Sequence, residues 1–330
     1  MDTFIPEMLA DLISWGWEQV AGLFGATEIS DLIDGARSGY VGKVQALLDQ
    51  PDVQVNEEKE INGLSYTPLL IAAEYGNHRV VKLLLKVDNI QVNFARKGDG
   101  STALFMATKN GHLKVAEQLL KRRDIDVNKR VRGCTPLNVA VKRGHKSIVD
   151  LFLKRTDVDV NLSSEEGVEE GVTPLFNASY LGYDKIVALL LKRDDIDVNK
   201  PVRFAGFTPL YAAAAKGYVG VVKLLVNHED IQVNKADHNG ANALMMALEK
   251  SESECFWIIV EKMMQPVYEN SECLACLDRR PNVVLIPCGH QILCSVCASQ
   301  LNAQGRGCPI DRIEIIHVTR TALRLDVQTF

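Results

Sequence analysis

The sequence lacks the features that mark membrane-spanning and secreted proteins. Its 330 residues contain no run of 18 apolar residues, so we expect no membrane span. The first thirty residues contain no lysine or arginine, and their acidic residues include Asp2, Glu7, Asp11 and Glu18. Because a secretory signal begins with positive charge, we expect none here. We therefore expect a cytoplasmic protein, with the nucleus as the alternative, in which thiols stay reduced.

The sequence also lacks an excess of basic residues and the common catalytic signatures. It has 37 Lys and Arg against 42 Asp and Glu, a net charge of −5, which argues against a general nucleic-acid binder. We find no Ser/His/Asp arrangement, no phosphate-binding glycine loop and no HExxH sequence, so a self-sufficient hydrolase or kinase is not supported. Apolar residues make up 47% of the chain, enough for a sizeable core.

Cysteine is rare outside one short stretch. Cys134 and Cys255 stand alone and are expected to be ordinary small residues. The other six lie within 36 residues: Cys273, Cys276, Cys288, Cys294, Cys297 and Cys308. In a reducing compartment, such clustering indicates metal binding and not disulfides. The sequence therefore divides near residue 270 into a cysteine-poor part and a compact metal module.

A repeat of about 35 residues fills the cysteine-poor part. A Thr-Pro-Leu or similar triplet begins at residues 67, 102, 135, 173 and 208, and Asn-Ala-Leu follows at 242, at steps of 35, 33, 38, 35 and 34. An alanine follows five residues after each start, a glycine nine residues after the first five, and a Val-Asn pair closes each unit. These landmarks predict stacked helical units that bury their apolar faces against one another.

Each unit has a predictable local structure. Threonine suits the N-cap, proline suits the first helical turn, and alanines follow where helices approach closely. Glycine then ends the first helix in a left-handed conformation, and a second helix carries apolar pairs such as Val80-Val81. The closing segment has no glycine, so we expect its Asp and Asn residues to stop the second helix in left-handed backbone.

The strings TPLLIAAEYGN, TPLNVAVKRGH and TPLYAAAAKGY resemble the ankyrin repeat over roughly residues 30–264. That resemblance implies five good repeats from 65 to about 235, between degenerate units at about 30–64 and 240–264. Before them, residues 1–29 carry an apolar helical stripe with Trp15 and Trp17. This segment is expected to cap the first repeat, or else to contact a membrane surface or a partner.

Ankyrin-like arrays bind proteins through the hairpin tips and the ends of the first helices. By the repeat register, the candidate substrate-binding residues are Tyr75, Lys109, Arg130, Arg132, Lys142, Arg143, Tyr180 and Phe204. Arg96 is also expected at an exposed tip. This face is basic and aromatic, which predicts a partner with an acidic segment, unless its residues are merely solvated.

Other basic and histidine residues have structural interpretations. The runs that contain Arg122, Arg155 and Arg193 follow the second helices, where they would neutralise the helix dipole and bind the last carbonyls. His112 and His145 follow the cap glycines and are expected to be structural. The stretch 163–171 is a lengthened, acidic loop.

The cysteine-rich module follows a linker at 265–272 and spans residues 273–312. It holds four ligand pairs: Cys273 and Cys276, Cys288 and His290, Cys294 and Cys297, and Cys308 and Asp311. Two pairs complete one tetrahedral zinc site, so eight ligands predict two Zn²⁺. The order of pairs, with PCGH at 287–290 and CPI at 308–310, resembles a RING domain.

The RING resemblance implies interleaved zinc sites. Cys273, Cys276, Cys294 and Cys297 would hold the first zinc, and Cys288, His290, Cys308 and Asp311 the second. Asp311 stands where most RING domains have cysteine, although carboxylate oxygen is an acceptable zinc ligand. The same resemblance implies a partner, a ubiquitin-conjugating enzyme that carries ubiquitin as a thioester.

Contact residues for that enzyme also follow from the resemblance. They would be Leu274, Ala275, Leu301 and Pro309, with Ala275 smaller than the usual aliphatic residue. Arg312 takes the place of the "linchpin" arginine, whose guanidinium can bond carbonyls of the enzyme and of ubiquitin together. A RING has no covalent nucleophile and acts by positioning.

Residues 313–330 partly alternate apolar and polar residues, which indicates a strand. The layout is similar to the RING of inhibitor-of-apoptosis proteins, which dimerise through such segments. The tail is therefore expected either to mediate a homodimer or to pack on its own chain.

The predicted fold is mostly α: an ankyrin-repeat helical solenoid followed by a small cross-brace RING zinc domain. The predicted function is that of a RING-type ubiquitin ligase whose array binds the substrate protein, with no nucleic-acid partner. A zinc-binding scaffold without ligase activity is the alternative, favoured by Ala275 and Asp311.

Overall fold

The structure is a computed structural model, and it describes residues 31–165, 171–250, 253–264, 283–286 and 317–320. The chain divides into two compact units, an amino-terminal unit of residues 1–158 and a carboxy-terminal unit of residues 159–330. The segment 1–29, predicted to be a helical cap, lies outside the described residues. No described helix is both long and apolar enough to cross a bilayer.

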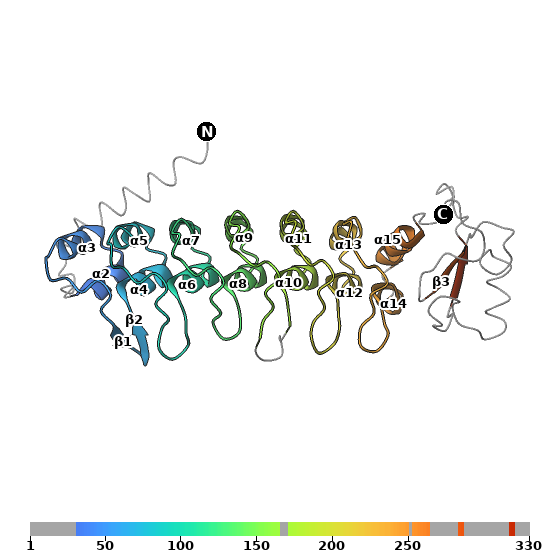
Figure 1. Cartoon of the computed structure of the whole chain (residues 1–330), viewed down its shortest axis with the longest axis horizontal. Helices are drawn as coiled ribbons and strands as arrows, with labels where there is room; N and C mark the ends of the chain where they lie inside the picture. The colour runs from blue at the N-terminus through green and yellow to red at the C-terminus, as the bar shows by residue number, and fades with distance from the viewer. Residues whose placement is uncertain (1–30, 166–170, 251–252, 265–282, 287–316, 321–330) are drawn as a thin grey trace, which may run out of the picture. The chain divides into compact units, whose positions relative to one another are not determined.

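The amino-terminal unit is a stack of helix pairs. Its first helices are α2 (Leu32–Ser38), α4 (Pro68–Tyr75), α6 (Ala103–Lys109) and α8 (Pro136–Lys142). Its second helices are α3 (Val41–Leu48), α5 (His78–Leu84), α7 (Leu113–Leu120) and α9 (Lys146–Leu153). Figure 1 shows the first helices in one row, the second helices in another, and the loops between repeats on the side of the first row.

The carboxy-terminal unit continues the same plan. Its helix pairs are α10 (Pro174–Tyr180) with α11 (Asp184–Leu190), α12 (Pro209–Ala215) with α13 (Val219–Val226), and α14 (Ala243–Glu249) with α15 (Ser253–Met264). Strands β3 (Val283–Ile286) and β4 (His317–Arg320) pair antiparallel, with Ile286 opposite His317. The fold is the mostly helical ankyrin-repeat solenoid that the sequence predicts.

Threonine begins the first helices as predicted. The Oγ1 of Thr67 accepts a hydrogen bond from the backbone N–H of Leu70 at 3.3 Å, and Thr173 does the same for Phe176 at 3.1 Å. Proline occupies the first turn of α4, α8, α10 and α12, where a missing N–H leaves no bond unmade. These caps hold helices of seven or eight residues, which are too short to be stable alone.

Buried alanines and leucines form the core of each unit. The repeat alanines Ala72, Ala107, Ala140, Ala178 and Ala213 are all 0% exposed, which lets neighbouring first helices approach closely. Leucines at the start of these helices are fully buried as well, and each contributes about 1.5–3 kcal/mol relative to an exposed side chain.

The glycines after the first helices adopt the left-handed conformation predicted for them. Gly111 has φ +77°, and a Cβ added there would lie 2.9 Å from the ring of His145 in the next repeat. His112 directly follows Gly111, just as His145 directly follows the cap glycine of its own repeat. The Nε2 of His112 donates to the carbonyl oxygen of Glu74 at 2.9 Å. The structural role predicted for His112 and His145 is confirmed.

The prediction for the ends of the second helices was wrong. Within the described part of the chain, Asn62 and Arg132 are the two non-glycine residues with positive φ, and neither ends a second helix. Instead, the Asn of the first five Val-Asn pairs bridges to the next repeat. The Nδ2 of Asn93 donates to Asp124 O at 2.7 Å, and its Oδ1 accepts from Asp126 N at 2.8 Å.

The arginines after the second helices also join neighbouring repeats. Arg122 donates through Nη1 to Leu85 O at 3.2 Å, and Arg155 donates to Arg122 O at 2.9 Å. The sequence had suggested that these arginines bind the last carbonyls of their own helix. The carbonyls that they bind belong to the preceding repeat instead. Asp124 and Asp157 orient these guanidinium groups at 2.7 and 2.6 Å.

A β-hairpin precedes α4 and was not predicted. Strands β1 (Lys59–Ile61) and β2 (Leu64–Tyr66) pair antiparallel through a two-residue turn, Asn62-Gly63, with φ of 53° and 76°. Asparagine followed by glycine suits this turn because both tolerate positive φ.

Candidate functional site

All eight predicted zinc ligands lie outside the described residues, as do Leu274, Ala275, Leu301, Pro309 and Arg312. The described residues contain no cluster of three or more His, Cys, Asp or Glu that could hold a metal ion. The donor set of six thiols, one imidazole and one carboxylate is of the type that tetrahedral zinc accepts.

The β3–β4 pair contains the described residues nearest in sequence to these ligands. β3 ends at Ile286, two residues before Cys288, and β4 begins at His317, six residues after Asp311. The pair joins residues 283–286 to residues 317–320, on either side of the predicted ligands from Cys288 to Asp311 in the sequence. It also confirms a strand in the tail and shows residues 317–320 packed on their own chain. A homodimer through the tail stays a prediction.

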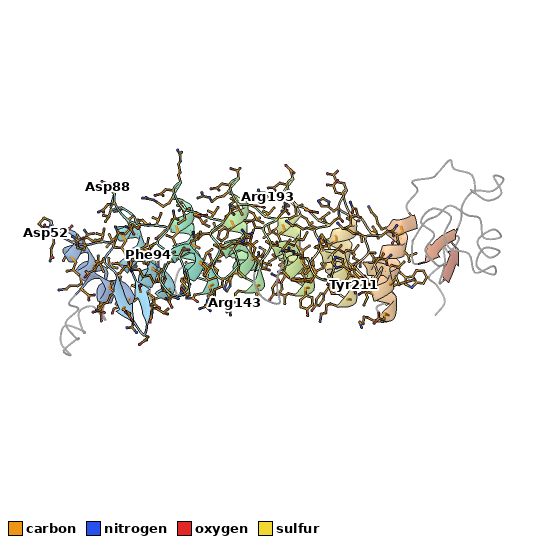
Figure 2. All side chains as sticks on the ribbon, turned by 60° about the horizontal axis from the view of Figure 1, so that its bottom comes forward. Asp52, Asp88, Phe94, Arg143, Arg193 and Tyr211 are labelled. Carbon is orange, nitrogen blue, oxygen red and sulfur yellow. The ribbon has the colours of Figure 1, made fainter. Side chains whose placement is uncertain are left out.

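The candidate binding residues of the array occupy the positions that the repeat register predicts. Tyr75, Lys109, Lys142 and Tyr180 are the last residues of α4, α6, α8 and α10. The aromatic members are exposed, with relative accessibilities of 51% for Tyr75, 46% for Tyr180 and 68% for Phe204. Figure 2 shows Arg143, which follows α8, at the opposite edge of the amino-terminal unit from Asp88, which follows a second helix.

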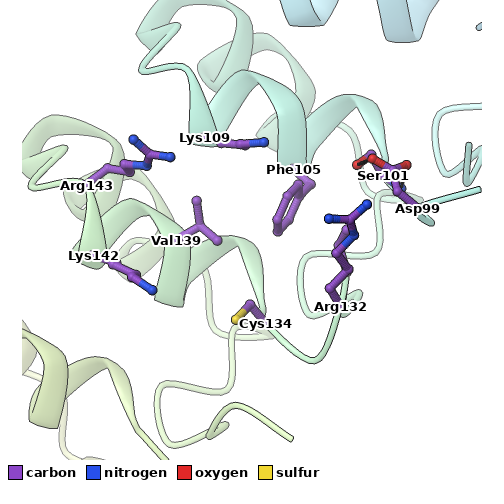
Figure 3. Close-up of a pocket in the computed structure, with 10 residues that line it drawn as sticks. Asp99, Ser101, Phe105, Lys109, Arg132, Cys134, Val139, Lys142 and Arg143 are labelled. Carbon is purple, nitrogen blue, oxygen red and sulfur yellow. Dashed lines mark hydrogen bonds between the residues drawn. The ribbon is translucent and has the colours of Figure 1, made fainter. Parts of the chain in front are cut away.

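Four of these residues share one pocket in the amino-terminal unit. Lys109, Arg132, Lys142 and Arg143 line a space of about 370 Å³ between α6, α8 and the loops that precede them. Figure 3 shows the side chains of Phe105 and Val139 at this space, with Lys109 on one side and Cys134 on another.

The remaining candidates are not part of this pocket. Tyr75 lies under the guanidinium of Arg37, 5.5 Å from ring centroid to Cζ. Tyr180 and Phe204 belong to the carboxy-terminal unit, where Lys216 Nζ lies 4.8 Å from the ring centroid of Tyr180. Arg130 is partly buried and is not among the residues that line the pocket.

The floor of the pocket was missed by sequence reasoning. Phe105, Met106 and Val131 form a buried cluster against which Val139 packs. Phe105 occupies the third position after the repeat threonine, where Phe176 and Tyr211 also stand. That shared aromatic position was the available signal, but core burial alone also explains it.

Arg132 reaches the pocket from an unfavourable backbone conformation. Val131 and Cys134 exchange backbone hydrogen bonds of 2.9 and 3.1 Å around the two-residue turn Arg132-Gly133. Arg132 has φ +49° and Gly133 has φ +73°, the pattern seen at Asn62-Gly63. A left-handed conformation costs a residue such as arginine about 1–2 kcal/mol.

Arg96 is buried, so its predicted place at an exposed tip was wrong. Its side chain is 5% exposed and donates to Asp99 at 2.9 Å from Nε and 2.6 Å from Nη2. It also donates to Glu74 at 3.2 Å and lies over the ring of Tyr66, with Cζ 4.8 Å from the ring centroid. Tyr66 and Glu74 come from the preceding repeat, so sequence position alone could not show this burial.

This arrangement partly offsets the negative charge of Asp99, which lines the pocket. Asp99 lines the pocket, but its carboxylate also accepts from the N–H of Ser101 at 3.0 Å and its hydroxyl at 2.8 Å. The hydrogen bonds from Arg96 hold the pKa of Asp99 well below its usual range. Arg96 shares its one positive charge between Asp99 and Glu74, so this carboxylate is only partly offset, while Lys109, Arg132, Lys142 and Arg143 bring four positive charges to the pocket.

Two family models match the sequence. The model of ankyrin repeats matches three times, over residues 32–131, 123–202 and 195–270. The model of the C3HC4-type zinc finger, or RING finger, matches residues 269–318. The RING finger implies zinc binding.

Curated relatives resemble the RING region. Baculoviral IAP repeat-containing protein 3 of Homo sapiens is 39% identical over 64 residues, which are 19% of this chain and 10% of that protein. The E3 ubiquitin-protein ligase XIAP of Xenopus laevis is 42% identical over 53 residues, 16% of this chain and 10% of that protein. The chain thus covers about a tenth of the length of these relatives.

Solved structures resemble the array. The ankyrin repeat domain of Bcl-3 has a TM-score of 0.61 and 22% identity, and the match covers 70% of this chain and 98% of that one. The human ASB11 ankyrin repeat domain has a TM-score of 0.54 and 26% identity, covering 72% and 99%. These likenesses show the fold.

Proposed function

The chain belongs to the ankyrin-repeat family and carries a C3HC4 RING finger, and on that premise we propose that it is a RING-type ubiquitin ligase. The single observation that carries the proposal is the RING match over residues 269–318, whose relatives include named E3 ubiquitin-protein ligases. The array would bind the substrate protein, and the RING would recruit a conjugating enzyme charged with ubiquitin.

The proposed zinc module holds two Zn²⁺. Cys273, Cys276, Cys294 and Cys297 bind the first, and Cys288, His290, Cys308 and Asp311 bind the second. The chemistry of the donors supports this assignment. Zinc has a structural role here: it folds the platform that contacts the conjugating enzyme.

The proposed transfer needs no covalent intermediate on this chain. Leu274, Ala275, Leu301 and Pro309 contact the conjugating enzyme, and Arg312 bonds carbonyls of that enzyme and of ubiquitin. The substrate lysine amine attacks the thioester carbonyl, an isopeptide bond forms and the thiol of the conjugating enzyme leaves. The rate gain comes from holding ubiquitin in a reactive orientation.

The proposed substrate surface lies, in each unit taken by itself, at the ends of the first helices and the loops before them. Its exposed aromatic residues and the cations Lys109, Arg132, Lys142 and Arg143 support binding of a protein with an acidic segment. This surface lies on the array, so substrate choice and ubiquitin transfer reside in different parts of the sequence.

A zinc-binding scaffold without ligase activity is the second candidate. Two departures from the usual RING pattern favour it: Ala275 offers a conjugating enzyme less apolar contact, and Asp311 replaces a thiolate ligand. A scaffold of this kind would bind zinc and a partner protein but would not stimulate transfer.

Self-ubiquitination of the full chain with a panel of conjugating enzymes separates the two candidates. We expect ubiquitin chains with at least one enzyme. No chains with any enzyme, from protein that contains two zinc ions per chain, would establish the scaffold and exclude the ligase.

A further inference from the structure

We propose that the pocket between α6 and α8 anchors an acidic peptide segment of the substrate by taking one apolar side chain between flanking carboxylates. The inference rests on the proposed function, because it defines the chemistry of the segment that the array would select. It assigns binding to one site among the several exposed patches of the two units.

The pocket has the size and the floor of an anchor site. Its volume of about 370 Å³ falls in the range of sites that enclose small ligands. Phe105, Val131 and Val139 supply an apolar floor, and Val139 is partly exposed. An aliphatic side chain placed there would lose water contact on several sides, which favours burial.

The rim selects the charge of the residues beside that anchor. Lys109, Lys142 and Arg143 come from the ends of α6 and α8, and Arg132 comes from the turn before α8. Asp99 also lines the pocket, where Arg96 and Ser101 already hydrogen-bond its carboxylate, so the rim carries four cations against one paired carboxylate. A peptide with carboxylates on both sides of an apolar residue matches this pattern in charge and polarity.

The backbone of Arg132 is the second, independent observation. The equivalent turn at residues 62–63 uses asparagine, which tolerates positive φ, whereas this turn forces an arginine to φ +49°. Strain of this kind persists where a side chain has a use that compensates for it. The turn fixes the backbone from which Arg132 extends to the rim, so ion pairing there need not order the loop.

A peptide fits the pocket better than a nucleic acid does. Nucleic-acid sites spread positive charge along a face, whereas these four cations surround one apolar depression on a chain of net charge −5. A single-stranded RNA is therefore the competing ligand in the test.

The experiment measures fluorescence anisotropy of a labelled peptide, a central leucine flanked by glutamates, with the full chain at physiological ionic strength. We expect saturable binding below about 1 mM, weakened about tenfold or more by R143E. The matched control is K192E, which makes the same charge change at an exposed lysine of the carboxy-terminal unit. Equal affinities of R143E and K192E would overturn the proposal, as would no saturable binding.

Arg132→Asn gives the sharpest readout because it should raise the stability of the protein and lower its affinity for the peptide. The substitution relieves the turn, so we expect a higher unfolding midpoint together with about tenfold weaker peptide binding. A purely structural Arg132 would leave affinity unchanged, and that result would remove it from the site.

Two altered ligands test the remaining parts of the proposal. A peptide with serine in place of leucine should bind several-fold more weakly, and equal binding would overturn the apolar anchor. Tighter binding of single-stranded RNA than of the peptide would assign the pocket to nucleic acid instead. If R143E and wild type both form ubiquitin chains while the peptide fails to bind, the anchor proposal fails and the ligase proposal stands.

Discussion

At the scale of single residues, the ion pair of Arg96 with Asp99 is the largest departure from what the sequence suggested. Both side chains are at least 89% buried, and each stabilises the other's charge. Because removing one partner leaves a buried charge with less compensation, we expect D99N to lower the free energy of unfolding by about 3 kcal/mol. Chemical denaturation followed by circular dichroism measures it.

The matched control is E117Q, which breaks the exposed pair of Glu117 with Lys121 at 2.8 Å. Exposed pairs four residues apart on a helix contribute about 0.3–0.5 kcal/mol, so this variant should unfold almost as wild type does. If D99N and E117Q lowered the free energy of unfolding equally, burial would not explain the contribution of Asp99.

The lowered pKa of Asp99 predicts a pH dependence of stability. The folded state holds this carboxyl ionised below its ordinary pKa, so its contribution is complete above about pH 5 and is lost as the pH falls through the folded-state pKa. Between pH 5 and strongly acidic conditions, wild type should therefore lose more stability than D99N. Parallel stability–pH curves would show that Asp99 does not titrate in this way.

Single residues were predictable where one repeat determines them. The threonine caps and the cap glycines follow from local rules, and both were predicted. Arg96 was not, because its partners Glu74 and Tyr66 lie in another repeat. The cationic pocket was predicted as a set of residues but not as one site, since its floor and the backbone of Arg132 become visible only in three dimensions.

At the scale of elements, the glycines between paired helices are needed for two reasons: a left-handed backbone conformation and a lack of space for a Cβ. Gly111 and Gly182 both have positive φ, and an added Cβ would lie 2.9 Å from the ring of His145 or Tyr218, respectively. We expect Gly182→Ala to lower the free energy of unfolding by at least about 1–2 kcal/mol, from backbone strain before the steric contact is counted. Thermal unfolding of the full chain measures the loss.

Gly42→Ala is the control for that substitution. Gly42 lies inside α3, has no strained φ, and an added Cβ would have nothing within 4 Å. Alanine there should stabilise the helix by about 0.5–1 kcal/mol. If both substitutions shifted the unfolding midpoint in the same direction, position-specific packing would not explain the glycines.

Elements were predictable where the repeat is regular. The first and second helices appear where the landmarks place them, but the segments that follow the second helices are held by asparagine and arginine bridges to the adjacent repeat. The hairpin β1–β2 was hidden because its repeat is degenerate, although Asn62-Gly63 was a usable turn signal. The strand in the tail was predicted, and its partner β3 was not.

At the scale of the whole molecule, zinc and the array should be separable. The described helices of the array contain no cluster of metal ligands, and their stability comes from apolar burial and bridges between repeats. We expect two zinc ions per chain by elemental analysis. Chelation should abolish ubiquitin transfer and keep most of the helical circular dichroism signal.

One zinc ion per chain would exclude the two-site assignment, and a large loss of helical signal on chelation would show that the array depends on the metal. A matched variant strengthens the test: C308S should lose zinc, whereas C134S, which changes a cysteine of the array, should retain both ions.

The domain order was predictable because cysteine spacing and repeat spacing are both written in the sequence. The substrate, in contrast, depends on how side chains from different repeats meet, and no single repeat contains that information. The pocket between α6 and α8 is an example, because its rim combines α6, α8 and a strained turn.

Ubiquitin discharge from a charged conjugating enzyme onto the amino acid lysine, with the full chain added, tests the ligase most directly because it needs no substrate. We expect the chain to accelerate discharge with at least one conjugating enzyme, and Arg312→Ala to reduce that rate at least about tenfold at unchanged zinc content. No acceleration by zinc-loaded protein with any conjugating enzyme would contradict the account.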